Sequence, residues 1–496
     1  MVLDVYTSLV AISLVAWLGG LVASTLHLPR IVPMILLGIV IFPSLHPSIF
    51  QTGISPPGYD FTASGGAQNP ASSIRAMALL IALIRGGLSV KVTFLKDFAI
   101  ATALLATVPY FFEVATEAFL APYLLADFYK DAPPLAAWES ASIWAPLSPS
   151  IVIPNMLRFV EDGLTEAGRV VLTGAPLEVS TALITEGVLD GILSAQTEGK
   201  NGNVVLGHIV TFIFGSILYG IAFALAFACY ARARAHVRVI ALAGPPDKTE
   251  HLLVFVMTAL LCYSTSIDSV VVPWLIGFFA CLCYAIATQY LLPSMADVFT
   301  VQLKSAWYFA EGYLFVLTGC VIRPAIDDSP SSLSSALFGN LFGLLFIGSL
   351  ARMCGDVFVG VAWQWTLTKI SPILWSKAIW KDVLRRIAFL WMATMPKATL
   401  QGTFGSKVAK TFQAAATRNP TYLGPADFVA PAAAVSILYC ATIGSLLTFT
   451  IGKSLAAYFQ EQTIAASSSI DAGETQEAEW GLLAHYDDEK KQATQS

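Results

Sequence analysis

The chain has 496 residues, of which 56% are hydrophobic and 12% are charged. An ordinary soluble domain has about 25% charged residues, so the composition excludes that class and indicates an integral membrane protein. The formal net charge of -5 is small and much of the acid lies near the C-terminus, so charge gives no reason to expect a nucleic-acid partner.

Apolar stretches of about 20 residues, the length that crosses a bilayer as a helix, recur along the chain. We therefore predict an all-α polytopic membrane protein. Basic residues collect in alternate connectors, which predicts an external N-terminus and a cytosolic C-terminus. The thirteen expected transmembrane helices start near residues 3, 31, 72, 97, 136, 169, 204, 250, 270, 302, 335, 385 and 425.

The sequence lacks the patterns that mark common enzyme sites. The seven cysteines show no CxxC or Cys/His metal-ligand spacing, and no nucleotide-binding loop or Ser/His/Asp order is visible. The connectors between the apolar stretches leave no room for a soluble domain. We therefore expect no enzyme, no cofactor and no resident metal.

Two apolar segments are interrupted by proline, SPSIVIP at 148–154 and MPKATLQG at 395–402. Proline removes a helical hydrogen bond and disfavours a helical residue before it. Unwound backbone at membrane depth is tolerated where it lines protein or a water-filled cavity. Two broken helices in corresponding halves of a chain are typical of inverted-repeat transporters, so we predict that the two segments meet in space.

The helix expected from about 169 to 195 carries acids inside an apolar run. An acid at membrane depth is costly and points to an ion site. A carboxylate at Glu178 would be protonated easily in a dry pocket, so a proton and a metal cation would compete for it. Thr181 on the same helical face and Ser148 at the first break could add oxygen ligands. The alternative is a structural carboxylate bonded to unwound backbone.

Glu186 is a further candidate ion ligand on this helix. It stands four residues before Asp190, nearer the expected helix end. We interpret the pair as part of a solvated vestibule.

Arg352 and Asp356 lie four residues apart in another apolar run, GSLARMCGDVFVG. A charge there must pair or face water. One interpretation is an ion pair within the helix. The other is that Arg352 compensates an acid from a different helix, for which Glu113 in VPYFFEVATEAFL is the candidate. Lys397 follows the second break, where its ammonium could neutralise helix C-terminal carbonyls, or could reach the membrane interface instead.

At these residues the chain resembles the NHA-type sodium/proton antiporters of the monovalent cation:proton antiporter superfamily, relatives of bacterial sodium/proton antiporter A. The resemblance runs from about residue 26 to 455, and its most specific parts are SPSIVIP and PKATLQG. The stretches that carry it are LPRIVPMILLGIVI, SSIRAMALLIALIRGGLSV, PYFFEVATEAFLAPYLL, LSPSIVIPNML, EGYLFVLTGC, MPKATLQGTFG and ATIGSLLTF.

The resemblance implies roles for several residues. Segments 148–154 and 396–401 would be the crossing discontinuous helices, Arg352 the basic residue of the core, Glu113 an acid that pairs with it, and Lys397 the lysine of the second crossover. Members of the family exchange sodium or lithium for protons as homodimers, with an ion-carrying core that moves as an elevator. Potassium is a further option for this chain.

The same resemblance implies a division of the chain. Residues 1–460 would form the exchanger domain, with core helices roughly at 72–196 and 302–411 and the remaining helices in a dimerisation domain. Residues 461–496 would be a disordered cytosolic tail, in line with their polar composition.

One position departs from the family pattern. The family has two consecutive acids in its ion-binding helix, whereas residues 174–180 read GAPLEVS, so that Val179 occupies the place of the second acid. Glu178 could carry the ion alone, another acid such as Glu186 or Glu113 could substitute, or transport could be lost in a structural or sensor homologue. A sodium-coupled organic-anion symporter of the same fold is a further alternative.

Overall fold

The computed structural model describes residues 5–26, 30–45, 70–198, 202–240, 248–267, 277–327, 335–370 and 379–461. Over these ranges the chain is helical and has no β-strand. The predicted all-α polytopic class is confirmed. The expected C-terminal tail lies, apart from Glu461, outside the described residues.

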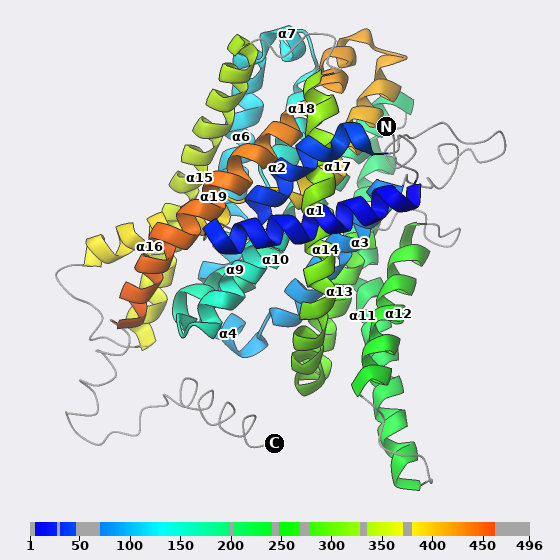
Figure 1. The fold of residues 1–496 in the computed structure, drawn as a ribbon, viewed down its shortest axis with the longest axis vertical. Helices are drawn as coiled ribbons and strands as arrows, with labels where there is room; N and C mark the ends of the chain where they lie inside the picture. Colours follow the sequence, from blue (N-terminus) through cyan, green and yellow to red (C-terminus); the bar gives the residue numbers. More distant parts are fainter. Residues whose placement is uncertain are drawn as a thin grey trace.

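The helices form one elongated bundle (Figure 1). In chain order they are α1 (Val5–Leu26), α2 (Ile31–Ile41), η1 (Phe42–Ser44), α3 (Pro70–Ser89), α4 (Val92–Asp97), α5 (Ala99–Leu105), α6 (Val108–Leu124), α7 (Ala126–Tyr129), α8 (Pro134–Trp144), α9 (Pro149–Glu161), α10 (Thr165–Glu198), α11 (Gly202–Ile240), α12 (Lys248–Ile267), α13 (Gly277–Leu291), α14 (Pro293–Asp327), α15 (Ser335–Ile370), α16 (Ile379–Thr394), α17 (Thr399–Ala416), η4 (Pro420–Tyr422), α18 (Leu423–Ser436), η5 (Ile437–Ala441), α19 (Thr442–Leu447) and η6 (Thr448–Gly452).

Each of the thirteen expected helices has a counterpart among these elements. The expected starts near 3 and 270 fall outside the described residues, and α1 and α13 begin shortly after them. Several expected helices are divided, since α8 and α9 replace the one expected near 136, and α16 and α17 the one near 385. The second division falls at Pro396, as predicted. The first lies at 145–148 and ends at Pro149, whereas Pro154 of the predicted segment lies inside α9 and does not interrupt it.

Five described segments are long and apolar enough to cross a membrane by length and composition alone. Many of the other helices are shortened by an interruption, or carry charged side chains that lower their mean hydropathy. The five are Tyr6–Leu26, Ala99–Leu124, Ile213–Arg234, Leu337–Leu367 and Pro420–Glu461.

Helix packing runs from one edge of the bundle to the other. Helix α11 packs on α13, α13 on α3, α3 on α14, and α14 on α2. At the opposite edge α15 lies along α6, and α16 packs on α15 (Figure 1). Helices α2 and α14 meet at Gly38 and Gly319, where a Cβ on either residue would overlap a backbone carbonyl of the other helix. Glycine at these two positions therefore permits the close approach.

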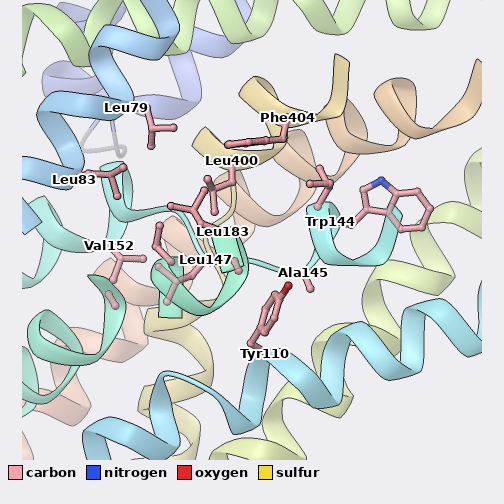
Figure 2. Packing of buried hydrophobic residues seen from close by; sticks show 14 of the residues in the cluster. Leu79, Leu83, Tyr110, Trp144, Ala145, Leu147, Val152, Leu183, Leu400 and Phe404 are labelled. Atoms are coloured by element: carbon pink, nitrogen blue, oxygen red, sulfur yellow. The ribbon is translucent and has the colours of Figure 1, made fainter. Parts of the chain in front are cut away.

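The apolar core surrounds both helix breaks. Figure 2 shows Trp144, Ala145 and Leu147 of the first break in the same cluster as Leu183 of α10 and Leu400 of α17. These side chains are at most 2% exposed. The unwound backbone is thus enclosed by protein, which is the condition under which such backbone is stable at membrane depth.

Candidate ion-binding site

The two helix breaks meet, as predicted. The Ser148 amide donates to the Pro396 carbonyl at 2.8 Å. The side-chain amide of Gln401 donates to the carbonyls of Pro146 at 2.7 Å and Trp144 at 3.2 Å. Carbonyls that lie outside the helical ladder at each break therefore find donors on the opposite broken helix.

Glu178 lies at this crossing on α10. Its carboxylate is 0% exposed and accepts from the Nη2 of Arg352 at 2.6 and 2.5 Å. The Leu147 amide, in the first break, donates to Oε1 of Glu178 at 3.2 Å. Both predicted features of this residue, its burial and its closeness to the unwound backbone, are present.

Arg352 of α15 makes five hydrogen bonds through its three guanidinium nitrogens. Two reach the oxygens of Glu178, one reaches Glu113 of α6 at 3.0 Å, and one reaches the Ala145 carbonyl at 3.3 Å. The fifth, Nε, donates to the hydroxyl of Thr394 at 3.0 Å. Each nitrogen of the guanidinium is therefore engaged.

Lys397 lies in the second break, where its ammonium donates to Oε1 of Glu113. It is 0% exposed, which excludes the interpretation that it reaches the membrane interface. Glu113, Glu178, Arg352 and Lys397 therefore form one buried group, the central charge cluster. Its two acids and two bases balance, as burial of charge requires.

Asp356 does not form the ion pair within α15 that one interpretation of its spacing suggested. Arg352 pairs with acids on α6 and α10 instead, as the other interpretation expected. Asp356 is 0% exposed, and neither of its carboxylate oxygens has a hydrogen-bond partner among the described residues.

Two further buried acids were not singled out from the sequence. Glu117 on α6 and Glu139 on α8 are each 0% exposed, and their carboxylates lack hydrogen-bond partners within the described part of the chain. The position of Glu117, four residues after Glu113 in an apolar run, was a signal that could have been used. Glu139 stands beside prolines and small residues and gave no comparable signal.

The two predicted hydroxyl ligands are placed differently. Ser148 lies at the crossing, and its hydroxyl is 2.8 Å from that of Ser150. Thr181 is half-buried, and its hydroxyl donates to the Leu177 carbonyl of its own helix at 3.1 Å. A threonine that bonds its own helix in this way keeps an oxygen lone pair for a ligand, and the role of both residues stays a prediction.

Glu186 belongs to a second ionic group on the same helix. Lys407 of α17 donates to Glu186 at 2.7 Å and to Asp190 at 3.2 Å. The Lys407 side chain is 48% exposed, whereas that of Glu186 is 5% exposed. We call these three residues the peripheral charge cluster.

Two cavities adjoin the broken helices. One lies beside α9 and is lined by Ser150, Asn155, Arg158 and Glu311 among others. The other lies beside α17, where its lining includes Gln401 and Thr318. Helix α14 contributes to both, since it carries Glu311 and Thr318. Each cavity thus adjoins α14 and one broken helix.

Solved structures share the fold of this chain. Two structures of the sodium/proton antiporter MjNhaP1 from Methanocaldococcus jannaschii match the chain at 16% sequence identity over 92% of its length. One, at pH 8, has a TM-score of 0.63 and is covered over 100% of its chain. The other, an electron-microscopy structure, has a TM-score of 0.65 and is covered over 98%.

The chain has the sodium/proton antiporter fold. Together with the apolar helices, this fold makes it an integral, multi-pass membrane protein. No protein-family model matches the chain, and no curated protein matches it either. The chain is therefore similar to the matched structures in the arrangement of its helices, and shares few residues with them.

Proposed function

We propose that the chain exchanges a monovalent cation, sodium or lithium, for protons. The observation that carries this proposal is the central charge cluster, a network of buried carboxylates at the point where two broken helices cross. A carboxylate in such a place is stable when a base, a proton or a metal cation neutralises it. Because the base, the proton and the metal cation exclude one another at the carboxylate, binding of the cation can be coupled to release of the proton, as exchange requires.

In this proposal Glu178 is a ligand of the cation. Arg352 neutralises Glu178 when no cation is present, and the cation replaces part of that interaction. Backbone carbonyls at the breaks, with the hydroxyls of Ser148 and Thr181, would complete an oxygen shell of the kind that hard cations prefer. The ammonium of Lys397 balances the negative charge of Glu113 throughout the cycle.

Alternating access would come from motion of the broken helices relative to α14. Each of the two cavities adjoins α14 and one broken helix, so a shift along α14 would widen one and narrow the other. We further propose that this shift is an elevator motion of the core and that the protein works as a homodimer. Mass measurement in detergent tests the second point.

Transport assays in proteoliposomes test the exchange itself. With an imposed pH gradient, the wild type should dissipate the gradient when sodium or lithium is added. Glu178→Gln should lower the rate at least tenfold, because the neutral amide cannot offset the cation charge. Glu250→Gln is the matched control. Glu250 forms an ion pair with Arg234, and both side chains are partly exposed and outside the central charge cluster. Removal of the Glu250 charge should leave the transport rate unchanged. Equal rates in Glu178→Gln and wild type would contradict the proposal.

A transport-inactive homologue is the second candidate, and Val179 favours it. Its side chain is 0% exposed and apolar where the family has an acid. In that case wild type would show no cation-dependent flux, and Val179→Asp would create it. An organic-anion symporter is less favoured, because the two buried bases that could attract an anion, Arg352 and Lys397, are already bound to carboxylates.

A further inference from the structure

The proposed function leaves open which group carries the exchanged proton. Glu178 already has a counter-charge, because Arg352 donates to both of its oxygens. The second acid that the family places after it is absent, since this chain has Val179 there. A further buried acid without a counter-charge would therefore be needed at the site.

Asp356 has the properties of that acid. It is 0% exposed, and its two oxygens find no hydrogen-bond donor within the described ranges. It lies one helical turn after Arg352 on α15, and its charge interacts with those of Arg352, Glu178 and Glu113. Because the central charge cluster is already balanced, an ionised Asp356 would add an uncompensated charge at membrane depth, which is costly.

The hydrogen bonds of Arg352 show where its charge is used. All three guanidinium nitrogens of Arg352 are engaged, by Glu178, Glu113, Thr394 and the Ala145 carbonyl. None of these bonds goes to Asp356, although it lies only one helical turn away on α15. A proton, or a cation from outside the protein, would balance the charge of Asp356.

Glu117 provides the contrast. It is also buried and without a hydrogen-bond partner in the described chain, and its strongest favourable electrostatic interaction is with Lys397. Lys397 has three N–H donors and gives one to Glu113. Glu117 therefore interacts with a base for which a single side-chain acceptor is found in the described chain, whereas the base nearest to Asp356 on α15, Arg352, is bound to two other acids.

We propose that Asp356 is the proton-carrying carboxylate of this exchanger and takes the place of the acid missing at Val179. The inference rests on the proposed function and assigns one step of it. When the cation binds between Asp356 and Glu178, the O–H bond of Asp356 breaks and its proton leaves to water. One positive charge enters the site and one leaves, so the exchange is one-for-one and moves no net charge.

Thr102 is a candidate further ligand of the cation. It lies on α5, which packs on both α10 and α15, and its buried hydroxyl has no hydrogen-bond partner in the described part of the chain.

Proton release on cation binding tests the inference directly. Purified protein in weakly buffered detergent solution is titrated with sodium chloride, and a pH dye counts the protons that appear. Wild type should release about one proton for each sodium bound, and Asp356→Asn at least tenfold fewer. Glu117→Gln, the matched removal of a buried unpartnered acid, should release as many as wild type. Asp356→Asn/Val179→Asp should recover release, because the acid returns to α10.

Thermal melting without sodium checks that each variant is folded. If Asp356→Asn alone does not fold, the double variant takes over the comparison, and a folded double variant that releases no protons contradicts the inference. Release that persists in folded Asp356→Asn also contradicts it, while exchange in vesicles remains, so the proposed function survives. A wild type with neither release nor exchange overturns the proposed function and this inference together.

Discussion

The central and peripheral charge clusters bring the same kinds of side chain together in different surroundings. Each pairs acids of α6 or α10 with a base from another helix. In the central cluster every side chain is 0% exposed, whereas Lys407 of the peripheral cluster is 48% exposed. Water reaches only the second cluster, through Lys407 and Asp190, since Glu186 is 5% exposed. The comparison teaches that burial, and not the number of ion pairs, decides how strongly each charge depends on its partner.

The largest expected effect is that of Arg352→Met. The substitution leaves Glu113 and Glu178 in a dry core with one base between them, which should destabilise the fold by about 3–5 kcal/mol. Unfolding by sodium dodecyl sulfate in mixed micelles measures the loss. As a control, Arg352→Met/Glu113→Gln/Glu178→Gln removes the stranded acids and should recover most of the stability. Unchanged stability in the single variant would show that the cluster is not a unit.

A smaller loss is expected for Lys397→Met. Glu113 loses its ammonium partner and keeps the guanidinium of Arg352. A hydrogen bond to a charged group contributes about 1.5–3 kcal/mol, and the same unfolding assay should show a loss in that range. A loss as large as that of Arg352→Met would mean that the two bases contribute equally to the cluster.

Gln401→Leu tests the crossing without changing a charge. The variant leaves the buried carbonyls of Trp144 and Pro146 without their donor, which should cost about 1–3 kcal/mol. Gln401→Glu is a sharper comparison, because an ionised carboxylate accepts and cannot donate to those carbonyls. If Gln401→Leu melts at the wild-type temperature, the hydrogen bonds between the broken helices do not stabilise the crossing.

The smallest effect is expected at the peripheral cluster. Lys407→Met removes ion pairs with Glu186 and Asp190. Glu186 is 5% exposed, but Lys407 is 48% and Asp190 25% exposed, so the loss should stay below that of Lys397→Met, at about 1 kcal/mol. The difference from wild type should vanish in about 1 M salt, where charges are screened within about 3 Å. A loss that resists salt would show that the peripheral cluster is as dry as the central one.

The sequence predicted the features that depend on local chemistry. Proline placed both helix breaks, and the apolar surroundings of Glu178 and Arg352 indicated that they were buried. It could not decide between Asp356 and Glu113 as the partner of Arg352, because helical spacing favours the near acid while packing of α6 on α15 brings the far one into reach. The ion pair of Lys407 with Glu186 was not predicted either, because it depends on how two helices far apart in the sequence pack together.

One contact at the crossing has a consequence for how freely this protein can change its sequence. The bond from Ser148 to Pro396 joins backbone to backbone, and only substitution by proline at the donor could abolish it. Other replacements of these side chains leave the bond in place. The crossing can therefore persist while residues around it diverge, which accords with a shared helix arrangement at 16% identity.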